Sequence, residues 1–262
     1  MRPRKTFNDM LGREVTINYP AKRIISLVPS QTELLADLGL NDEVVGITKF
    51  CVHPEAWFRS KERVGGTKTL NIDKIRELKP DLIIANKEEN EKEQIEELAN
   101  EFPVWISDVD TLPHALLMMQ VVGQMTGTDG DAVNLVDEIV HAFTGLNHAA
   151  EPKKVAYLMW RDPWMTVGGD TFIGHMIHVL GWKNAYEKQT RYPEVTAEDL
   201  KAINPDMVLL SSEPFPFKEK HIAEVKTVLP NAQVKLVDGE MFSWYGSRLL
   251  KATDYFRELL SE

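Results

Sequence analysis

The sequence predicts an α/β protein of two lobes, each with a central, mostly parallel sheet, joined by a single long α-helix. Three observations predict this class. A pattern of strands and helices occurs twice along the chain. Short Val/Ile/Leu-rich runs alternate with amphipathic helices, which is typical of parallel sheets covered on both faces. One helical pattern, without a Gly/Ser-rich linker, separates the two copies, and 262 residues are enough for two cores.

The repeat is clearest around two Pro-Asp pairs. Residues 75–90, "IRELKPDLIIANKEEN", and residues 200–215, "LKAINPDMVLLSSEPF", each indicate the end of a helix, a break and a buried strand. Upstream, each copy has a strand, a loop and an amphipathic helix that ends at Gly39 or Gly181. Downstream, each has another strand, which ends at Asp108 or Asp238. The order β-loop-α, α-β, β therefore occurs twice.

The segment between the copies predicts one helix from about residue 129 to 149. Apolar residues recur there at helical spacing, and they are Val133, Val136, Ile139, Val140 and Phe143. We therefore divide the chain into an N-terminal lobe (1–128), a linking helix (129–150) and a C-terminal lobe (151–262). A stiff link limits the opening of a cleft, which favours a receptor that binds its ligand without a large hinge closure.

Composition narrows the class of partner. With 30 basic and 40 acidic residues the net charge is −10, which disfavours nucleic acid and anionic membranes as partners. The longest apolar run, "ALLMMQVVG", is too short to cross a bilayer. The first 20 residues carry positive charge but no apolar stretch, so no signal peptide is visible. We expect a monomer.

Ligands of parallel α/β sheets bind beyond the carboxyl ends of the strands, so the loops there are the candidate site. Several contain large aromatic side chains, which suit a large flat ligand. We expect a cleft between the lobes, and a packing role within the lobe is the alternative for each aromatic residue. One side would be lined by Trp160, Arg161, Trp164, Phe242, Trp244 and Tyr245, the other by Pro29, Ser30, His53 and Lys87, with Tyr192 at the rim.

Three segments of the chain resemble those of a known family. "RIISLVPSQTELLADLGLNDEVVGIT", "RVGGTKTLNIDKIRELKPDLIIA" and "EVTAEDLKAINPDMVLL" are similar to the substrate-binding proteins of ABC importers with a rigid helical backbone, the helical backbone metal receptors. The resemblance covers nearly the whole chain and implies the class III periplasmic-binding-protein fold, a periplasmic location and an ABC permease as partner. It implies cobalamin, haem or a ferric siderophore as the transported ligand, and the cobalamin-binding members are the most similar.

The repeat and the resemblance together single out two acidic residues. Asp73 and Glu198 each lie seven residues before the proline of their Pro-Asp pair, in the first turns of equivalent helices. Asn71 and Thr196 are the expected N-caps. The helix dipole alone favours carboxylates there. In the family, one acidic residue on each lobe docks onto arginines of the permease, and these positions match.

Other features of the sequence weigh against a corrinoid, a metal site or an enzyme. After the first Pro-Asp strand this chain has "ANKEEN", whereas the cobalamin binders have a segment that resembles "AWRGGN", so Lys87 replaces their tryptophan. Cys51 and His53 are weak metal-ligand candidates, because two ligands do not make a site; contact of His53 with an organic ligand is the favoured alternative. The phosphate-loop, dinucleotide, zinc-protease and serine-hydrolase motifs are absent. The sequence therefore predicts no enzyme and no required cofactor.

Two alternatives stay open. One is a cytoplasmic protein that handles or modifies a tetrapyrrole or metal complex on the same scaffold. The other is a scaffold that no longer binds a ligand and serves only protein partners.

Overall fold

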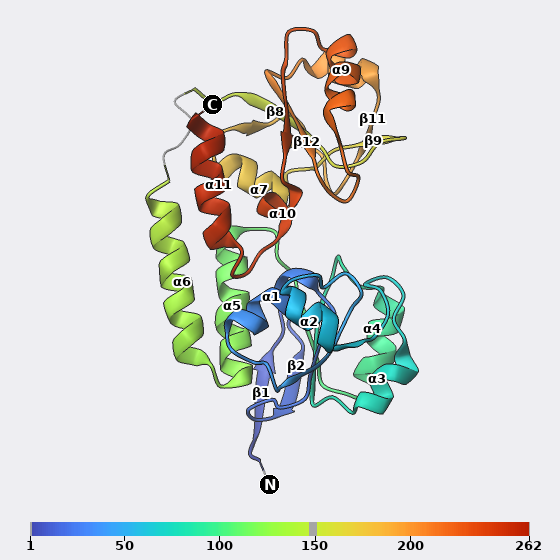
Figure 1. The fold of residues 1–262 in the computed structure, drawn as a ribbon, viewed down its shortest axis with the longest axis vertical. Coiled ribbons are helices and arrows are strands. Elements are labelled where there is room, and N and C mark those ends of the chain that lie inside the picture. The colour runs from blue at the N-terminus through green and yellow to red at the C-terminus, as the bar shows by residue number, and fades with distance from the viewer. Residues whose placement is uncertain (1, 147–150, 262) are drawn as a thin grey trace. The chain divides into compact units, whose positions relative to one another are not determined.

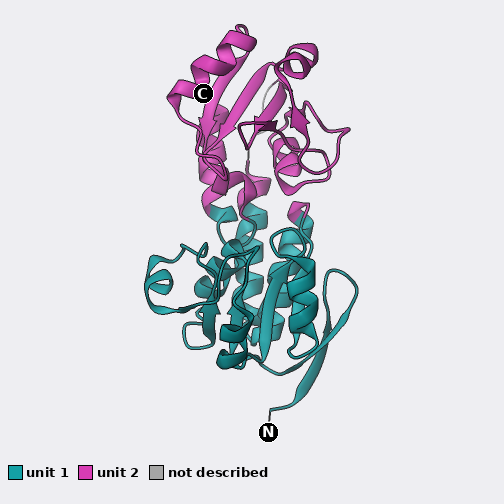
Figure 2. Ribbon diagram, turned by 90° about the vertical axis from the view of Figure 1, so that its right-hand side faces the viewer, with its two compact units in different colours: residues 1–109, 113–141, 245–250 teal, residues 110–112, 142–244, 251–262 magenta. Residues whose placement is uncertain are grey.

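The computed structural model describes residues 2–146 and 151–261 (Figure 1). These form two compact units, coloured in Figure 2. Unit 1 comprises Met1–Val109, Pro113–His141 and Tyr245–Leu250. Unit 2 comprises Asp110–Leu112, Ala142–Trp244 and Lys251–Glu262. The predicted fold class, two α/β lobes with mostly parallel sheets, is confirmed.

Unit 1 is built on a parallel sheet of five strands in the order β5-β4-β3-β6-β7, with a separate antiparallel hairpin of β1 and β2. Its apolar core lies between β3 and β6 and the helices α3 and α4, where Ile25, Ile75, Ile83 and Leu98 are fully buried. The strands are β1 (Arg4–Asn8), β2 (Glu14–Asn18), β3 (Ile24–Ser26), β4 (Val44–Ile47), β5 (Glu62–Arg63), β6 (Leu82–Asn86) and β7 (Val104–Ser107). The helices are α1 (Pro29–Asp37), α2 (Glu55–Ser60), α3 (Ile72–Leu78), α4 (Lys92–Ala99), nearly all of α5 (Leu112–Thr126) and most of α6 (Asp129–Thr144).

Unit 2 repeats this plan with a parallel four-stranded sheet in the order β10-β8-β12-β13 and an antiparallel pair of β9 and β11. Leu158, Leu200, Val208 and Leu210 are fully buried in its core. The strands are β8 (Lys154–Leu158), β9 (Trp164–Met165), β10 (Lys183–Asn184), β11 (Glu194–Val195), β12 (Met207–Ser211) and β13 (Gln233–Val237). The helices are α7 (Phe172–Val179), α8 (Ala197–Ile203), α9 (Glu219–Val228), α10 (Gly239–Ser243) and most of α11 (Leu249–Ser261).

The Pro-Asp pairs have the same structural role in both units. The carboxylate of Asp81 accepts the backbone N–H of Arg23 at 2.7 Å, and that of Asp206 accepts the backbone N–H of Lys154 at 2.7 Å. Each aspartate therefore fixes the backbone just before the adjacent strand, β3 or β8. The predicted N-caps are also confirmed, because Asn71 accepts the Lys74 N–H and Thr196 is part of a capping box.

The helix predicted over 129–149 is α6, which ends at Thr144, and residues 147–150 lie outside the described part of the chain. α5 and α6 run side by side in Figure 1 and pack closely where Gly123 meets Ala132. A Cβ at Gly123 would lie 2.3 Å from that of Ala132, so this contact requires glycine. No helix in the described residues is long and apolar enough to cross a membrane.

Two segments belong to a different unit from the lobe to which the sequence assigned them, and the shorter, Asp110–Leu112, lies in unit 2. Residues 245–250 were expected in the C-terminal lobe, but their contacts place them in unit 1. Arg248 donates two hydrogen bonds to Glu33 of α1, at 2.7 and 2.9 Å, and both side chains are buried. Gly246 lies against Ser30, with a φ of 122° that favours glycine.

Candidate functional site

The strand orders define one crevice in each unit. In unit 1 the chain runs outward from β3 to β4 and β5, then returns to the other side of β3 with β6. In unit 2 it leaves β8 for β10 and returns with β12. Ligands of open α/β sheets bind at the carboxyl ends of the strands where the order reverses. The candidate surfaces are therefore the loops after β3 and β6 in unit 1, and after β8 and β12 in unit 2.

The crevice of unit 1 is built around Asn86, the last residue of β6. Its amide donates to the carbonyl oxygen of Ser107 at 3.1 Å, and its side-chain oxygen accepts the N–H of Glu88 at 2.8 Å. Asn90 reaches across to the loop after β3 and donates to the Leu27 carbonyl at 3.3 Å. This network fixes the loop that presents Lys87, which is exposed and forms an ion pair with Asp108 at 2.6 Å.

The other unit 1 candidates surround α1. Pro29 is half-buried at the first turn of α1, and Ser30 is buried beside it. Cys51 is fully buried and accepts a hydrogen bond from Thr32 at 3.0 Å, and burial raises the pKa of its thiol. Metals bind the thiolate, so this environment disfavours Cys51 as a ligand. His53 is half-buried two residues further on.

The crevice of unit 2 is bridged by hydrogen bonds and lined by aromatic rings. The hydroxyl of Tyr157 on β8 donates to Ser211 on β12 at 2.9 Å, and the Phe215 N–H donates to the Met159 carbonyl at 3.2 Å. These bonds join the two loops. Trp160, 39% exposed, packs edge-on against Phe215 with ring centroids 6.0 Å apart. An exposed indole at the crevice is a suitable surface for a flat ligand.

The sequence prediction missed Glu213, a half-buried carboxylate two residues after β12. It accepts the indole N–H of Trp244 at 3.1 Å and the hydroxyl of Ser243 at 2.9 Å. Burial raises its pKa despite these two hydrogen bonds. The repeat could have identified it: counted from Asp81 and Asp206, Glu213 is the counterpart of Glu88 in unit 1.

The remaining predicted residues of unit 2 have varied environments. Arg161 forms an ion pair with Glu224 at 3.0 Å, and Trp164 packs against the core of the unit. Tyr192 is half-buried in the loop before β11, with the Arg191 guanidinium 5.9 Å from its ring. Phe242 has no exposed surface because it packs between Tyr157 and Phe256, so we remove it from the candidate site.

Tyr245, at the start of the segment that belongs to unit 1, and Trp244 are each 8% exposed. Asp73 and Glu198 both lie exposed in the first turns of α3 and α8. Asp73 contacts Arg76 at 3.1 Å, whereas Glu198 forms no ion pair with the described residues.

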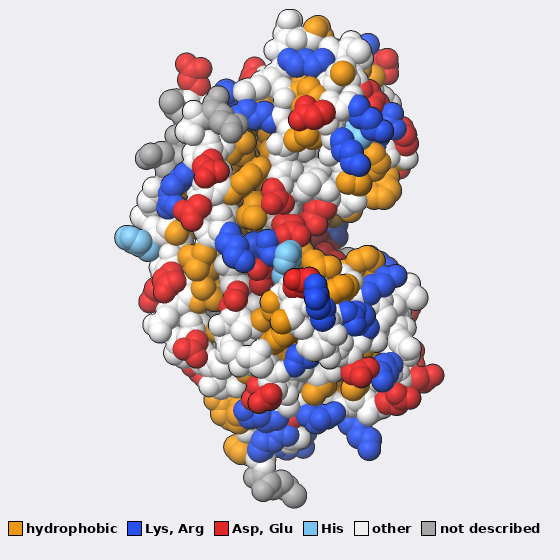
Figure 3. Space-filling model, viewed as in Figure 1, with side chains coloured by type: hydrophobic (Ala, Val, Ile, Leu, Met, Phe, Trp, Pro, Cys, Tyr) orange, Lys and Arg blue, Asp and Glu red, His pale blue; other side chains and the backbone are white. Residues whose placement is uncertain are grey.

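Metal chemistry finds no support in the arrangement of side chains. Within residues 2–146 and 151–261, no group of three or more His, Cys, Asp or Glu side chains is placed to bind a metal ion. On the face shown in Figure 3, acidic, basic and apolar side chains are interspersed.

Comparison with known proteins identifies a family and relatives that match most of the chain. A model of the family described as "Periplasmic binding protein" matches residues 24–231. The chain is 28% identical to YvrC of Bacillus subtilis strain 168, an uncharacterized ABC transporter substrate-binding lipoprotein, over 97% of this chain and 84% of that one. It is 25% identical to the vitamin B12-binding protein of Yersinia pestis (strain Pestoides F), over 73% and 70% of the two chains.

Two solved structures show the same fold. The petrobactin-binding protein YclQ of Bacillus subtilis matches with a TM-score of 0.85 and 19% identity, over 100% of both chains. The periplasmic vitamin B12-binding protein BtuF of Vibrio cholerae matches with a TM-score of 0.74 and 24% identity, over 92% of this chain and 97% of that one.

Proposed function

Because this chain belongs to the periplasmic binding protein family, whose members bind solutes rather than catalyse reactions, we propose that it is the substrate-binding component of an ABC importer and that its ligand is a corrinoid. The main support is that both units have a carboxylate at the same position of the crevice. Glu88 lies two residues after β6, and Glu213 lies two residues after β12. In unit 2 the exposed ring of Trp160 lies in the same crevice.

The charge of these crevices supports a corrinoid over the two rival ligand classes. A corrinoid carries uncharged carboxamide arms around a flat ring, and their N–H groups can donate to Glu88 and Glu213. Haem carries two propionates, and ferric catecholates are anionic, so both would be repelled by these carboxylates. Cations near these crevices form ion pairs with other residues: Lys87 with Asp108, Arg161 with Glu224, and Lys68, which also donates to the Glu88 carbonyl, with Glu91.

We propose that each unit contributes one ligand-contacting surface. The surface of unit 1 comprises Pro29, Ser30, His53, Lys87 and Tyr245. The surface of unit 2 comprises Trp160, Arg161, Trp164, Tyr192, Glu213 and Trp244. Similarity to a lipoprotein and to vitamin B12-binding proteins supports action outside the cytoplasmic membrane.

A titration of intrinsic tryptophan fluorescence with cobalamin, cobinamide, haem and a ferric catecholate tests the ligand. We expect saturation at one equivalent for the corrinoids, and weaker binding in Trp160→Ala and Glu213→Gln. The matched control is Glu219→Gln, an exposed carboxylate at the start of α9, which should bind as the wild type does. Saturation by haem or the catecholate alone would replace the corrinoid with that ligand.

We further propose that Asp73 and Glu198 dock onto a membrane permease. Both are exposed, at equivalent positions of equivalent helices, and neither is needed for its helix cap, which Asn71 and Thr196 supply. The double variant Asp73→Ala/Glu198→Ala should bind the ligand normally and lose uptake in a permease-coupled assay. Intact uptake in this double variant would rule out docking through these residues.

A further inference from the structure

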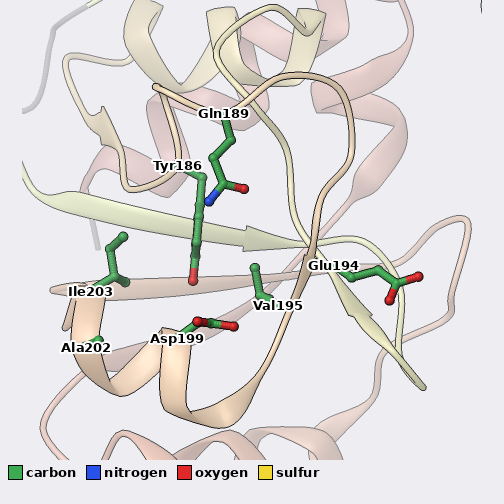
Figure 4. A pocket seen from close by; sticks show the side chains of 7 residues that line it. All are labelled: Tyr186, Gln189, Glu194, Val195, Asp199, Ala202 and Ile203. Carbon is green, nitrogen blue, oxygen red and sulfur yellow. The ribbon is translucent and has the colours of Figure 1, made fainter.

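Unit 2 contains a cavity of about 450 Å³ beside α8 that the proposed ligand surfaces do not include. Its walls come from the loop between β10 and β11 (Tyr186, Gln189), from β11 (Glu194, Val195) and from α8 (Asp199, Ile203), as Figure 4 shows. α8 leads into the amino end of β12, and the carbonyl of Ile203 accepts a hydrogen bond from Lys154 at the start of β8. The α8 side of the cavity therefore lies toward the amino ends of β8 and β12, away from the loops that follow these two strands.

The floor of this cavity contains a hydroxyl group without a partner. Tyr186 is 3% exposed, and its buried hydroxyl makes no hydrogen bond in the described structure. In Figure 4 its ring extends into the cavity, with the hydroxyl end toward Ile203 and Asp199. Buried hydroxyls nearly always have a partner, as that of Tyr157 has in Ser211. The Tyr186 hydroxyl is therefore an unfilled hydrogen-bonding position.

Asp199 brings a negative charge to this hydroxyl, while the Lys154 ammonium lies on the carbonyl of Ile203. Asp199 accepts the backbone N–H and the hydroxyl of Thr196, at 2.8 and 2.7 Å, and these bonds lower its pKa, so it is ionised at neutral pH. Burial, with the charge of Asp199, raises the pKa of Tyr186 to about 12, so the phenol is neutral. The described lining includes no Lys or Arg, and in Figure 4 the carboxylate of Glu194 points away from Tyr186, so Asp199 is the carboxylate next to the phenol.

The rest of the wall is apolar, because Val195, Ala202 and Ile203 contribute only hydrocarbon. A matching ligand would combine a positive charge, N–H donors for a carboxylate and a phenol oxygen, and a short hydrocarbon stem. Cavities of a few hundred Å³ with a few convergent polar groups are of the size that binds small molecules.

We propose that this cavity is a binding site for a small organic cation, an alkyl guanidinium or alkyl ammonium group. The N–H groups of the cation donate to the Asp199 carboxylate and to the Tyr186 oxygen, and its stem packs against Val195 and Ile203. The exposed side chain of Gln189 moves aside to admit it. The site shares no lining residue with the proposed corrinoid surfaces, although Val195 pairs with Trp164 of the unit 2 surface.

Ligand-observed NMR of the full chain with n-butylguanidinium tests the site. n-Butyrate, with an alkyl stem of similar length and the opposite charge, is the control ligand. We expect saturable binding of the cation at one site, none of butyrate, and affinity about tenfold weaker in Tyr186→Phe, the effect of one hydrogen bond. Tyr157→Phe, which removes a hydroxyl that already has a partner, should bind the cation as the wild type does.

Three results would overturn the proposal: no saturable binding of the cation, equal binding of butyrate, or unchanged affinity in Tyr186→Phe. The first would mean that the hydroxyl contacts at most a water molecule. Cobalamin titration of the same Tyr186→Phe protein keeps the two proposals distinct, because corrinoid binding should be unaffected by this substitution.

Discussion

The helix-to-strand element that occurs twice, α3–β6 and α8–β12, is alike in its backbone chemistry and different on its exposed side. Both helices have seven residues and end in a left-handed residue, Lys79 or Asn204, with φ of 47° and 46°. On the exposed side, Arg76 of α3 contacts Asp73, Glu97 and Glu101, whereas Glu198 of α8 forms no ion pair with the described residues.

Comparison of the two copies separates the features that the sheet requires from those that it does not. The aspartate of the Pro-Asp pair, the cap and the left-handed residue recur because they place the strand beside its neighbour. The surface ion pairs contribute little stability, and they differ between the copies. An exposed carboxylate in the first turn nevertheless occurs in both copies, Asp73 and Glu198, although only one has a local partner.

Substitution of Asp81 or Asp206 should cause the largest loss of free energy of unfolding, and the loss should differ between the two copies. Asp81 accepts the N–H groups of Lys22 and Arg23 and also contacts Arg2, whereas Asp206, which is exposed, accepts one backbone N–H. We expect Asp81→Ala to lower the free energy of unfolding by about 2–3 kcal/mol and Asp206→Ala by about 1–2 kcal/mol. Urea unfolding followed by tryptophan fluorescence measures both, and equal losses would contradict the ranking.

Substitution of the two N-cap residues should cause the next largest loss of stability. Asn71→Ala and Thr196→Ala should each lower the free energy of unfolding by about 1 kcal/mol, because each removes one bond to an otherwise unsatisfied helical N–H. Thr196→Ala should cost more than Asn71→Ala, since Asp199 also loses its bond from the Thr196 hydroxyl. Unfolding in urea gives the comparison, with the exposed Glu219→Ala as control. A larger loss for Asn71→Ala would show that the capping box adds nothing.

The smallest effect should be a difference in pH dependence between the two caps. Hydrogen bonds from Thr196 lower the pKa of Asp199, whereas the cap of α3 is the uncharged Asn71. A lowered folded-state pKa means that the folded protein binds fewer protons than the unfolded chain. The stabilisation from Asp199 is therefore present above the unfolded pKa of about 3.9 and is lost as pH falls through the folded pKa.

An NMR titration of the Asp199 carboxyl carbon tests this sign directly. We expect a midpoint below that of a model aspartate, and a shift upward in Thr196→Ala. Asp73, which begins the first turn of α3, provides the comparison within the same protein. A midpoint for Asp199 that does not move in Thr196→Ala would contradict the assigned cause.

The sequence predicted what depends on local chemistry and on repetition. The Pro-Asp elements, the caps Asn71 and Thr196 and the parallel sheets followed from spacing and residue type, the family followed from a resemblance, and each is confirmed. The spacing of apolar residues along a helix or strand indicates which of its side chains are buried, and this was sufficient to predict the fold class.

Tertiary partners were not predictable in the same way. Phe242 was expected at the ligand because it follows a strand, but periodicity could not show that Tyr157 and Phe256 enclose it. Residues 245–250 were assigned to the wrong unit because the Arg248–Glu33 ion pair joins positions 215 residues apart. Glu213 was missed although the two copies had been aligned, because the sequence does not show that its carboxylate is half-buried beside Ser243 and Trp244.

We propose that the duplicated crevices, with their carboxylates and the exposed indole, recognise an uncharged corrinoid. The most direct measurement is a cobalamin titration of the wild type, Glu213→Gln and Glu219→Gln, followed by tryptophan fluorescence. We predict saturation at one equivalent, and affinity about tenfold weaker in Glu213→Gln alone, as expected for one hydrogen bond to a charged group. Unchanged affinity in Glu213→Gln, or no saturable response to cobalamin, would contradict the claim.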